Sequence, residues 1–138
     1  MNVKICGKQK ELIELQLQNL RPSHGMAEPF ETEIHVQIQS GSWKSSYFSQ
    51  YVQTKNLISF LRDLKSLVSL SHETAQLQDS DDLLFIRVAL SKNKEEIWIY
   101  GHAKEVDHKN ELRFSFESNP VLMTTLLNQI DDLQLAES

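Results

Sequence analysis

The sequence predicts an α+β fold: an antiparallel β-sheet of about seven or eight strands, partly a meander, with two α-helices packed on one face. Three observations support this class. Short runs in which apolar and polar residues alternate occur in two groups, as in strands with one buried face. Apolar residues follow a helical period in one stretch between these groups and in another after them. Short turns connect the later runs, which favours antiparallel neighbours.

Four strand-like runs make up the first group. VKIC is followed by a turn at Gly7, and in ELIELQLQN the residues Ile13, Leu15 and Leu17 share one face. The stretch RPSHGMAEP (21–29) contains two of the three prolines and is predicted to be a loop. FETEIHVQIQS repeats the alternation, and a Gly-Ser turn leads into WKSSYFSQYVQ. This last run leaves its buried face open, because large apolar residues occur at positions of both parities.

Two amphipathic helices are predicted. In the first, from about residue 55 to 70, apolar residues recur at i, i+3, i+4 and i+7, and Thr54 is the expected N-cap. The second runs from about residue 120 to 135, with Asn119 as its N-cap and Pro120 at its first helical position. Its apolar stripe consists of Leu122, Leu126, Ile130 and Leu133.

The second group of strands lies between the two helices. A short strand through Ala75 and Leu77 is followed by the acidic turn DSDD. LLFIRVAL, IWIYGHAK and LRFSFES then form a meander, separated by the turns SKNKEE and EVDHKNE. Within IWIYGHAK, Ile97 and Ile99 belong to the buried face of the strand, whereas Trp98 belongs to the opposite face.

Composition and charge restrict the function. The chain has 138 residues with a globular balance of apolar and charged residues, which predicts a single domain over 1–138. The only cysteine, Cys6, has no partner for an internal disulfide, and the N-terminus lacks a signal-like apolar stretch. Both observations favour a cytoplasmic location. No apolar run is long enough to span a membrane, and the net charge of −5 argues against direct binding of nucleic acid.

The stretch WIYGHAKEVDH (98–108) raises the question of catalysis. His102, Glu105, Asp107 and His108 are all competent metal ligands or proton carriers. Zinc needs three or four ligands that converge on one point, and one strand face followed by a turn does not supply them. The sequence has no nucleophile elbow and no phosphate-binding glycine motif. We therefore predict no catalytic residue, no metal site and no cofactor. A solvated hairpin is favoured over a hydrolase that uses His102.

Two features favour a binding surface instead. Trp98, Tyr100 and His102 share the strand face opposite the apolar stripe, and aromatic residues are enriched at protein interfaces. Acidic residues gather in the turns of the meander; they are Asp79, Asp81, Asp82, Glu95, Glu96, Glu105 and Asp107. Alternate turns of a meander lie at the same end, so the first and third turns would form an acidic rim that attracts a basic partner. The alternatives are that the aromatic residues cover a minor core and that the acids serve solvation alone.

Most of the chain resembles the WapI-type immunity proteins, small cytoplasmic proteins that neutralise the toxin domain of bacterial polymorphic or contact-dependent toxin systems. The resemblance is carried by MNVKICGKQKELIELQL, IHVQIQSGSWKSSY, NLISFLRDLKSL, LLFIRVALSKNKEEIWIYG and NELRFSFESNPVLMTTLLNQIDDL. It implies a non-enzymatic inhibitor that binds a cognate toxin domain, with a nuclease as one candidate. The alternative is a small α+β binding or scaffold module without a toxin partner. Neither interpretation decides between a monomer and a homodimer.

Overall fold

A computed structural model describes residues 2–17, 31–39, 45–79, 81–105 and 111–132. The chain order is β1 (Asn2–Cys6), β2 (Leu12–Leu17), β3 (Glu31–Gln39), β4 (Ser45–Gln53), α1 (Thr54–Val68), β5 (Thr74–Gln78), β6 (Leu84–Leu90), β7 (Ile97–Lys104), β8 (Glu111–Ser118) and α2 (Thr124–Asp132). All pairs of neighbouring strands are antiparallel. The predicted α+β class and the meander are therefore confirmed.

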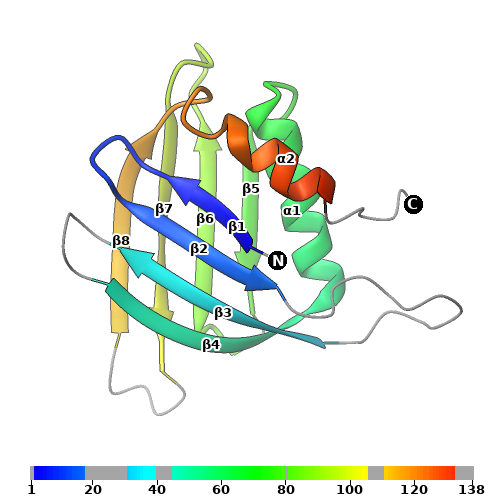
Figure 1. Cartoon of the computed structure of the whole chain (residues 1–138), viewed down its shortest axis with the longest axis vertical. Helices are drawn as coiled ribbons and strands as arrows, with labels where there is room; N and C mark the ends of the chain where they lie inside the picture. Colours follow the sequence, from blue (N-terminus) through cyan, green and yellow to red (C-terminus); the bar gives the residue numbers. More distant parts are fainter. Residues whose placement is uncertain (1, 18–30, 40–44, 80, 106–110, 133–138) are drawn as a thin grey trace, which may run out of the picture.

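The strands form two sheets of four rather than one continuous sheet. The orders are β1-β2-β3-β4 and β5-β6-β7-β8, with α1 as the connection between them. Figure 1 shows the strands of the first sheet running across those of the second. Two helices of 15 and 9 residues are too few to cover one eight-stranded sheet. In two smaller sheets the apolar faces are still buried, because each sheet packs its apolar face against that of the other.

The hydrophobic core lies between the two sheets. Alternate residues of the strands point into it, as the sequence pattern predicts. In β2 these residues are Ile13, Leu15 and Leu17, and in β6 they are Leu84, Ile86, Val88 and Leu90. The buried residues of both sheets and both helices form one cluster. The described part of the chain is thus organised around a single core.

The pairing of β3 with β4 settles the buried face that the sequence leaves open. Val36 stands opposite Phe48, so Phe48 shares the inner face with its buried neighbour. Val52 is also buried. Tyr47 and Tyr51 consequently lie on the outer face, where they are 72% and 61% exposed.

Helix α1 begins at Thr54 and presents eight buried residues to the core. Thr54 is not its N-cap: Gln53 occupies that position and makes no side-chain capping bond. The Thr54 hydroxyl instead pairs with the hydroxyl of Thr32 in β3, 2.7 Å away in the interior. The local pattern could not reveal this partner, because Thr32 lies in a different strand, 22 positions before Thr54.

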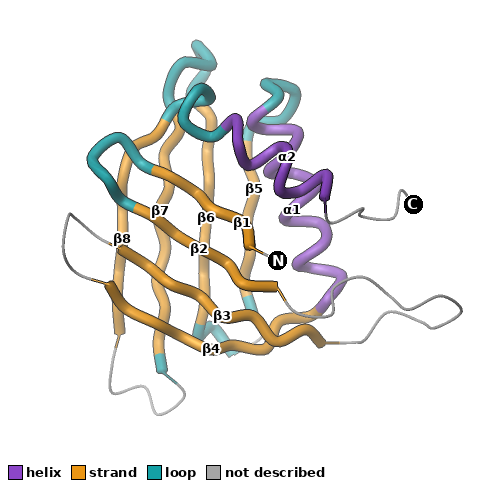
Figure 2. Tube along the Cα trace, viewed as in Figure 1, coloured by secondary structure: helices purple, strands orange, loops and turns teal. Residues whose placement is uncertain are grey.

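Helix α2 starts at Thr124, later than expected, and the end expected near residue 135 lies outside the described residues. Asn119 Oδ1 accepts a 2.8 Å hydrogen bond from the amide of Leu122, so Asn119 stabilises the turn before the helix. Helix α1 packs against β5, and α2 packs against β1 and α1 (Figure 2). The structure therefore does not show both helices on one face of a single sheet.

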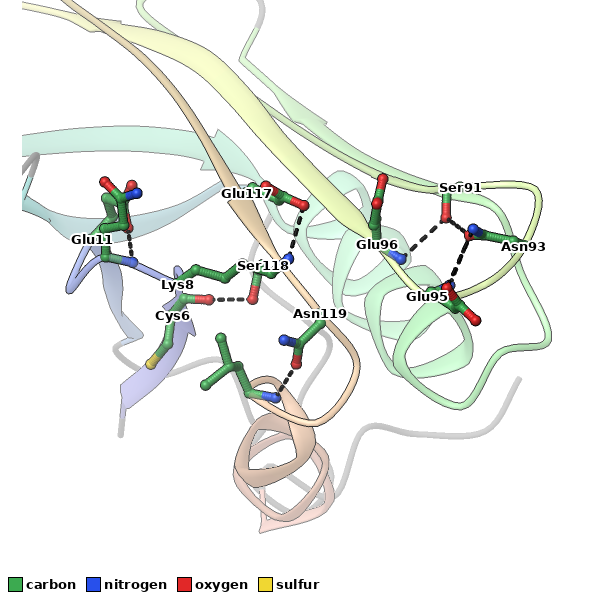
Figure 3. A network of polar contacts seen from close by, with 12 residues as sticks. Cys6, Lys8, Glu11, Ser91, Asn93, Glu95, Glu96, Glu117, Ser118 and Asn119 are labelled. Carbon is green, nitrogen blue, oxygen red and sulfur yellow. Dashed lines mark hydrogen bonds and ion pairs between the residues drawn. The ribbon is translucent and has the colours of Figure 1, made fainter.

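Hydrogen bonds between segments distant in sequence join the two sheets. The Ser118 hydroxyl donates to the carbonyl oxygen of Cys6, and the amide of Lys8 donates to the carbonyl of Glu117 at 2.9 Å; Figure 3 shows the first of these bonds. At the far edge, Gln50 Nε2 donates to the carbonyl of Lys104 at 2.8 Å. Neither described helix is long and apolar enough to cross a membrane.

Candidate protein-binding face

The outer face of the second sheet carries a row of aromatic side chains. β6 and β7 pair so that Phe85 stands opposite His102 and Arg87 opposite Tyr100. Trp98 and Tyr100 are 45% and 39% exposed. The ring of Phe85 is stacked on that of His102, with centroids 5.8 Å apart, and tilted against that of Tyr100 at 6.4 Å. We call Phe85, Trp98, Tyr100 and His102 the aromatic row.

Polar strands border the aromatic row on both sides. β5 contributes Thr74, Gln76 and Gln78, and β8 contributes Glu111, Arg113, Ser115 and Glu117. Arg113 Nε donates to Glu111 at 3.0 Å, and this hydrogen bond lowers the pKa of the Glu111 carboxyl. Lys8 donates to Glu117 at 2.9 Å, and this hydrogen bond raises the pKa of the lysine. An apolar centre with a polar, charge-balanced border is the layout of a protein interface.

Arg87 lies inside this face and is weakly held. Its guanidinium reaches Gln76 Oε1 through one long contact of 3.5 Å. Its Nε atom is buried and has no hydrogen-bond partner among the described residues. A buried donor without an acceptor costs stability. A hydrogen bond from this side chain to an acceptor on a binding partner would therefore be favourable. Arginine also contributes strongly to binding at many interfaces.

His102 is anchored to the turn between β5 and β6. Its Nε2 lies 3.2 Å from Asp82 Oδ1 and 3.1 Å from the backbone oxygen of Asp82. Gln78 Nε2 donates to the same carboxylate at 3.3 Å. Asp82 has a φ of 57°, a left-handed conformation that aspartate tolerates better than most residues. These contacts hold the ring of His102 beside that of Phe85, so His102 has a structural role.

The acidic residues of the first turn have different roles. Asp79 is only 7% exposed, and its Oδ1 accepts a 3.1 Å hydrogen bond from the amide of Leu84. The buried Asp79 carboxylate therefore stabilises the turn, whereas Asp81 and Asp82 are exposed. Exposed Glu105 lies at the same end of the sheet, since the amide of Lys104 bonds the carbonyl of Leu83 at 2.7 Å. Asp107 lies outside the described residues.

Glu95 and Glu96 lie at the opposite end of the sheet, in the turn between β6 and β7. The amide of Glu95 donates to Asn93 Oδ1, and that of Glu96 donates to Ser91 Oγ, each at 3.1 Å (Figure 3). β7 has eight residues, so the two ends of the sheet are roughly 25 Å apart. The described acidic residues thus flank the aromatic row at both ends and do not form one patch.

Sequence parity places Trp98, Tyr100 and His102 together, but Phe85 and Arg87 were missed as members of the same face. Their signal is present in LLFIRVAL, where they alternate with the buried residues Leu84, Ile86 and Val88. A second exposed aromatic pair, Tyr47 and Tyr51, lies on the outer face of the first sheet. The charge of Glu33 raises the pKa of the Tyr51 hydroxyl, which donates to that carboxylate at 3.2 Å.

Within the described part of the chain, no three histidine, cysteine, aspartate or glutamate side chains are placed to hold a metal ion. His108, one of the ligands considered from the sequence, lies outside that part. Comparison of the chain with protein-family models, with curated proteins and with solved structures finds no match. Functional inference therefore depends on the chemistry of the aromatic row and its surroundings.

Proposed function

We propose that the chain is a non-enzymatic inhibitor of the immunity type, which binds a toxin domain through the outer face of β5–β8. The observation that carries the proposal is the aromatic row. Trp98 and Tyr100 are large, rigid and exposed, and Arg87 lies beside them with a buried donor that has no partner among the described residues. Tryptophan, tyrosine and arginine are the residue types that contribute most to binding at protein interfaces.

The geometry also supports the way such an inhibitor works. A sheet face of four strands measures roughly 20 Å by 25 Å, so a standard interface of about 800 Å² per partner extends over it and onto the flanking turns. Those turns carry Asp81, Glu95 and Glu105. Exposed acidic residues in these turns suit a basic partner, such as the nucleic-acid-binding surface of a nuclease toxin. Inhibition then follows by occlusion of the toxin's active site, without chemistry by this chain.

The proposal predicts that a reading frame next to this gene encodes the toxin domain, and that domain, prepared in a catalytically inactive form, is the ligand for the test. Trp98→Ala removes the largest exposed ring, and we expect the Kd for the toxin to rise roughly thirtyfold, about 2 kcal/mol. Isothermal titration calorimetry measures the Kd, and circular dichroism checks the fold. Val121→Ala is the matched control, because Val121 is an exposed apolar residue in the turn before α2.

Two results would count against this proposal. If Trp98→Ala and Val121→Ala change the Kd equally, the aromatic row is not the binding face. If the wild-type chain neither binds the toxin domain nor protects cells that produce the active toxin, the immunity role itself is wrong. A general binding module that recognises some other protein would then be the better description.

A further inference from the structure

The two sheets have four edge strands, and three of these are protected against pairing with another chain. The edge of β1 is covered by α2: Gln129 Oε1 accepts a 2.9 Å hydrogen bond from the amide of Lys4. β5 packs against α1. β8 bears charged side chains, and the carbonyl of Glu117 already accepts the amide of Lys8. Covering and charging are the usual means by which proteins keep an edge from pairing.

Among the described residues, none protects the fourth edge strand, β4, in either of these ways. It has nine residues, SSYFSQYVQ, with no charged residue and no proline. It stands at the end of the strand order and, within the described part of the chain, pairs only with β3. Its outer face presents Tyr47 and Tyr51, the two most exposed aromatic side chains of the described residues. A long, neutral edge strand rich in aromatic residues is a template for a further strand.

We propose that a second copy of this chain supplies that strand. Two copies of β4 pair antiparallel about a twofold axis at Ser49, and the two four-stranded sheets become one continuous sheet across the dimer. Ser49 is the midpoint of Ser45–Gln53, so all nine residues find an opposite residue in this register. A twofold interface needs such a self-complementary surface.

The side chains on the outer face match in this register. Tyr47 of each copy stands opposite Tyr51 of the second copy, which gives two cross-strand aromatic pairs of the kind that stabilise antiparallel sheets. Ser49 stands opposite its own counterpart, and in each copy its hydroxyl donates to Glu33 of the same copy's β3 at 3.1 Å. Each copy carries a net charge of −5, so two copies repel each other in general. β4 itself has no charged side chain, so two copies can approach along this strand at a lower electrostatic cost than along the charged edge strand β8.

Disulfide trapping tests the register directly. In a Cys6→Ser background, which removes the only native cysteine, Ser49→Cys places two thiols opposite each other. Opposed residues of an antiparallel pair have Cα atoms about 4.5–5.5 Å apart, within the range for a disulfide. We expect a covalent dimer on non-reducing electrophoresis after mild oxidation. Ser115→Cys is the matched control: Ser115 is also an exposed serine, near the middle of the edge strand β8, and this variant should run as a monomer on the same gel.

Sedimentation equilibrium tests the association without a cross-link. We expect the wild type to form dimers as its concentration rises, and Ser49→Glu to raise the dimer dissociation constant roughly tenfold or more, because two carboxylates would face each other at about 5 Å. Ser115→Glu should leave the constant unchanged, and circular dichroism should show both variants folded. Trp98→Ala should also dimerise normally, because the aromatic row belongs to the other sheet; this separates the dimer from the proposed toxin binding.

Two outcomes would overturn the proposal. One is a wild type that stays monomeric at every concentration measured; if its toxin binding is then lost in Ser49→Glu, the β4 edge belongs to a strand of the toxin instead. The other is cross-linking of Ser115→Cys as fast as that of Ser49→Cys, which would show random collision.

Discussion

Gly101 determines how closely β6 and β7 approach beneath the aromatic row. It lies between Tyr100 and His102 in β7 and stands opposite Ile86. A Cβ atom added at this position would lie 1.8 Å from the carbonyl oxygen of Phe85 and 3.0 Å from the ring of Phe114. The first of these atoms belongs to the backbone, so it cannot move aside as a side chain does. Only glycine fits here.

We therefore expect Gly101→Ala to destabilise the protein by about 1–3 kcal/mol, the usual cost of overpacking a core. The shift of β7 should also displace the rings on either side. Urea unfolding followed by tryptophan fluorescence measures the free energy of unfolding. Ser115→Ala, an exposed change on the neighbouring strand, should stay within about 0.5 kcal/mol of the wild type. Equal stability of the two variants would contradict a close backbone contact at Gly101.

At the scale of single residues, the sequence predicts to which face of a strand a side chain points better than it predicts what that side chain contacts. Alternation in IWIYGHAK correctly places Trp98 and Tyr100 away from the core, because strand parity is a local property. The roles of Asp79 and Thr54 depend on partners in other elements. Asp79 accepts a hydrogen bond from the amide of Leu84 at the start of β6, and Thr54 pairs with Thr32 of β3. A polar residue in a turn or at a helix start gives no local sign of such burial.

The start of helix α1 illustrates how one element is attached to another. Thr32 and Thr54 are both buried, and each hydroxyl is the other's hydrogen-bond partner at 2.7 Å. Val52, the last apolar residue of β4, stands opposite Thr32. The pair thus holds the junction of β4 and α1 against β3, in a region where a lone hydroxyl would have no access to water.

We expect Thr54→Val to cost about 1–3 kcal/mol, because it leaves the Thr32 hydroxyl buried without a partner. The double variant Thr32→Val/Thr54→Val should recover most of this loss, since two apolar groups of the same shape replace the pair. Thermal and urea unfolding of the four proteins in this cycle measure the coupling. Additive losses in the double variant would show that the two hydroxyls do not act as a pair.

At the scale of elements, periodicity predicts the strands and helices, and it fails where the arrangement depends on contacts between distant segments. The run from Ser45 to Gln53 has large apolar residues on both faces, so only its pairing with β3 decides that Phe48 points inward. The division into two sheets has the same origin. It is set by contacts such as that of Gln50 with Lys104, whose residues are 54 positions apart. Nothing in either local pattern indicates this contact.

At the scale of the whole molecule, the two-sheet arrangement gives the chain two separate outer faces. The face of the second sheet carries the aromatic row, with exposed acidic residues at both ends. The first sheet ends in the neutral edge strand β4. A dimer through β4 would leave the aromatic rows of both copies outside the paired strands. The two proposed interactions therefore use different parts of the molecule, and a dimer could bind two toxin domains.

The charge distribution predicts a kinetic effect on toxin binding. The net charge of −5 attracts a basic partner from a distance, but acids beside the aromatic row act on it most strongly during docking. We expect Asp81→Lys and Glu95→Lys, made singly, to slow association roughly fivefold at low salt and to change the dissociation rate less, because both residues are exposed. Stopped-flow fluorescence at several salt concentrations measures these rates.

Glu31→Lys provides the matched control for this prediction. Glu31 is exposed at the start of β3, on the outer face of the first sheet. Its reversal changes the net charge by the same amount as the two test variants, but far from the aromatic row. If the acidic turns steer the toxin, Glu31→Lys should slow association less than either test variant, and salt should reduce all the differences. Equal slowing by all three variants would show that net charge alone matters and that the acidic turns have no part in orienting the partner.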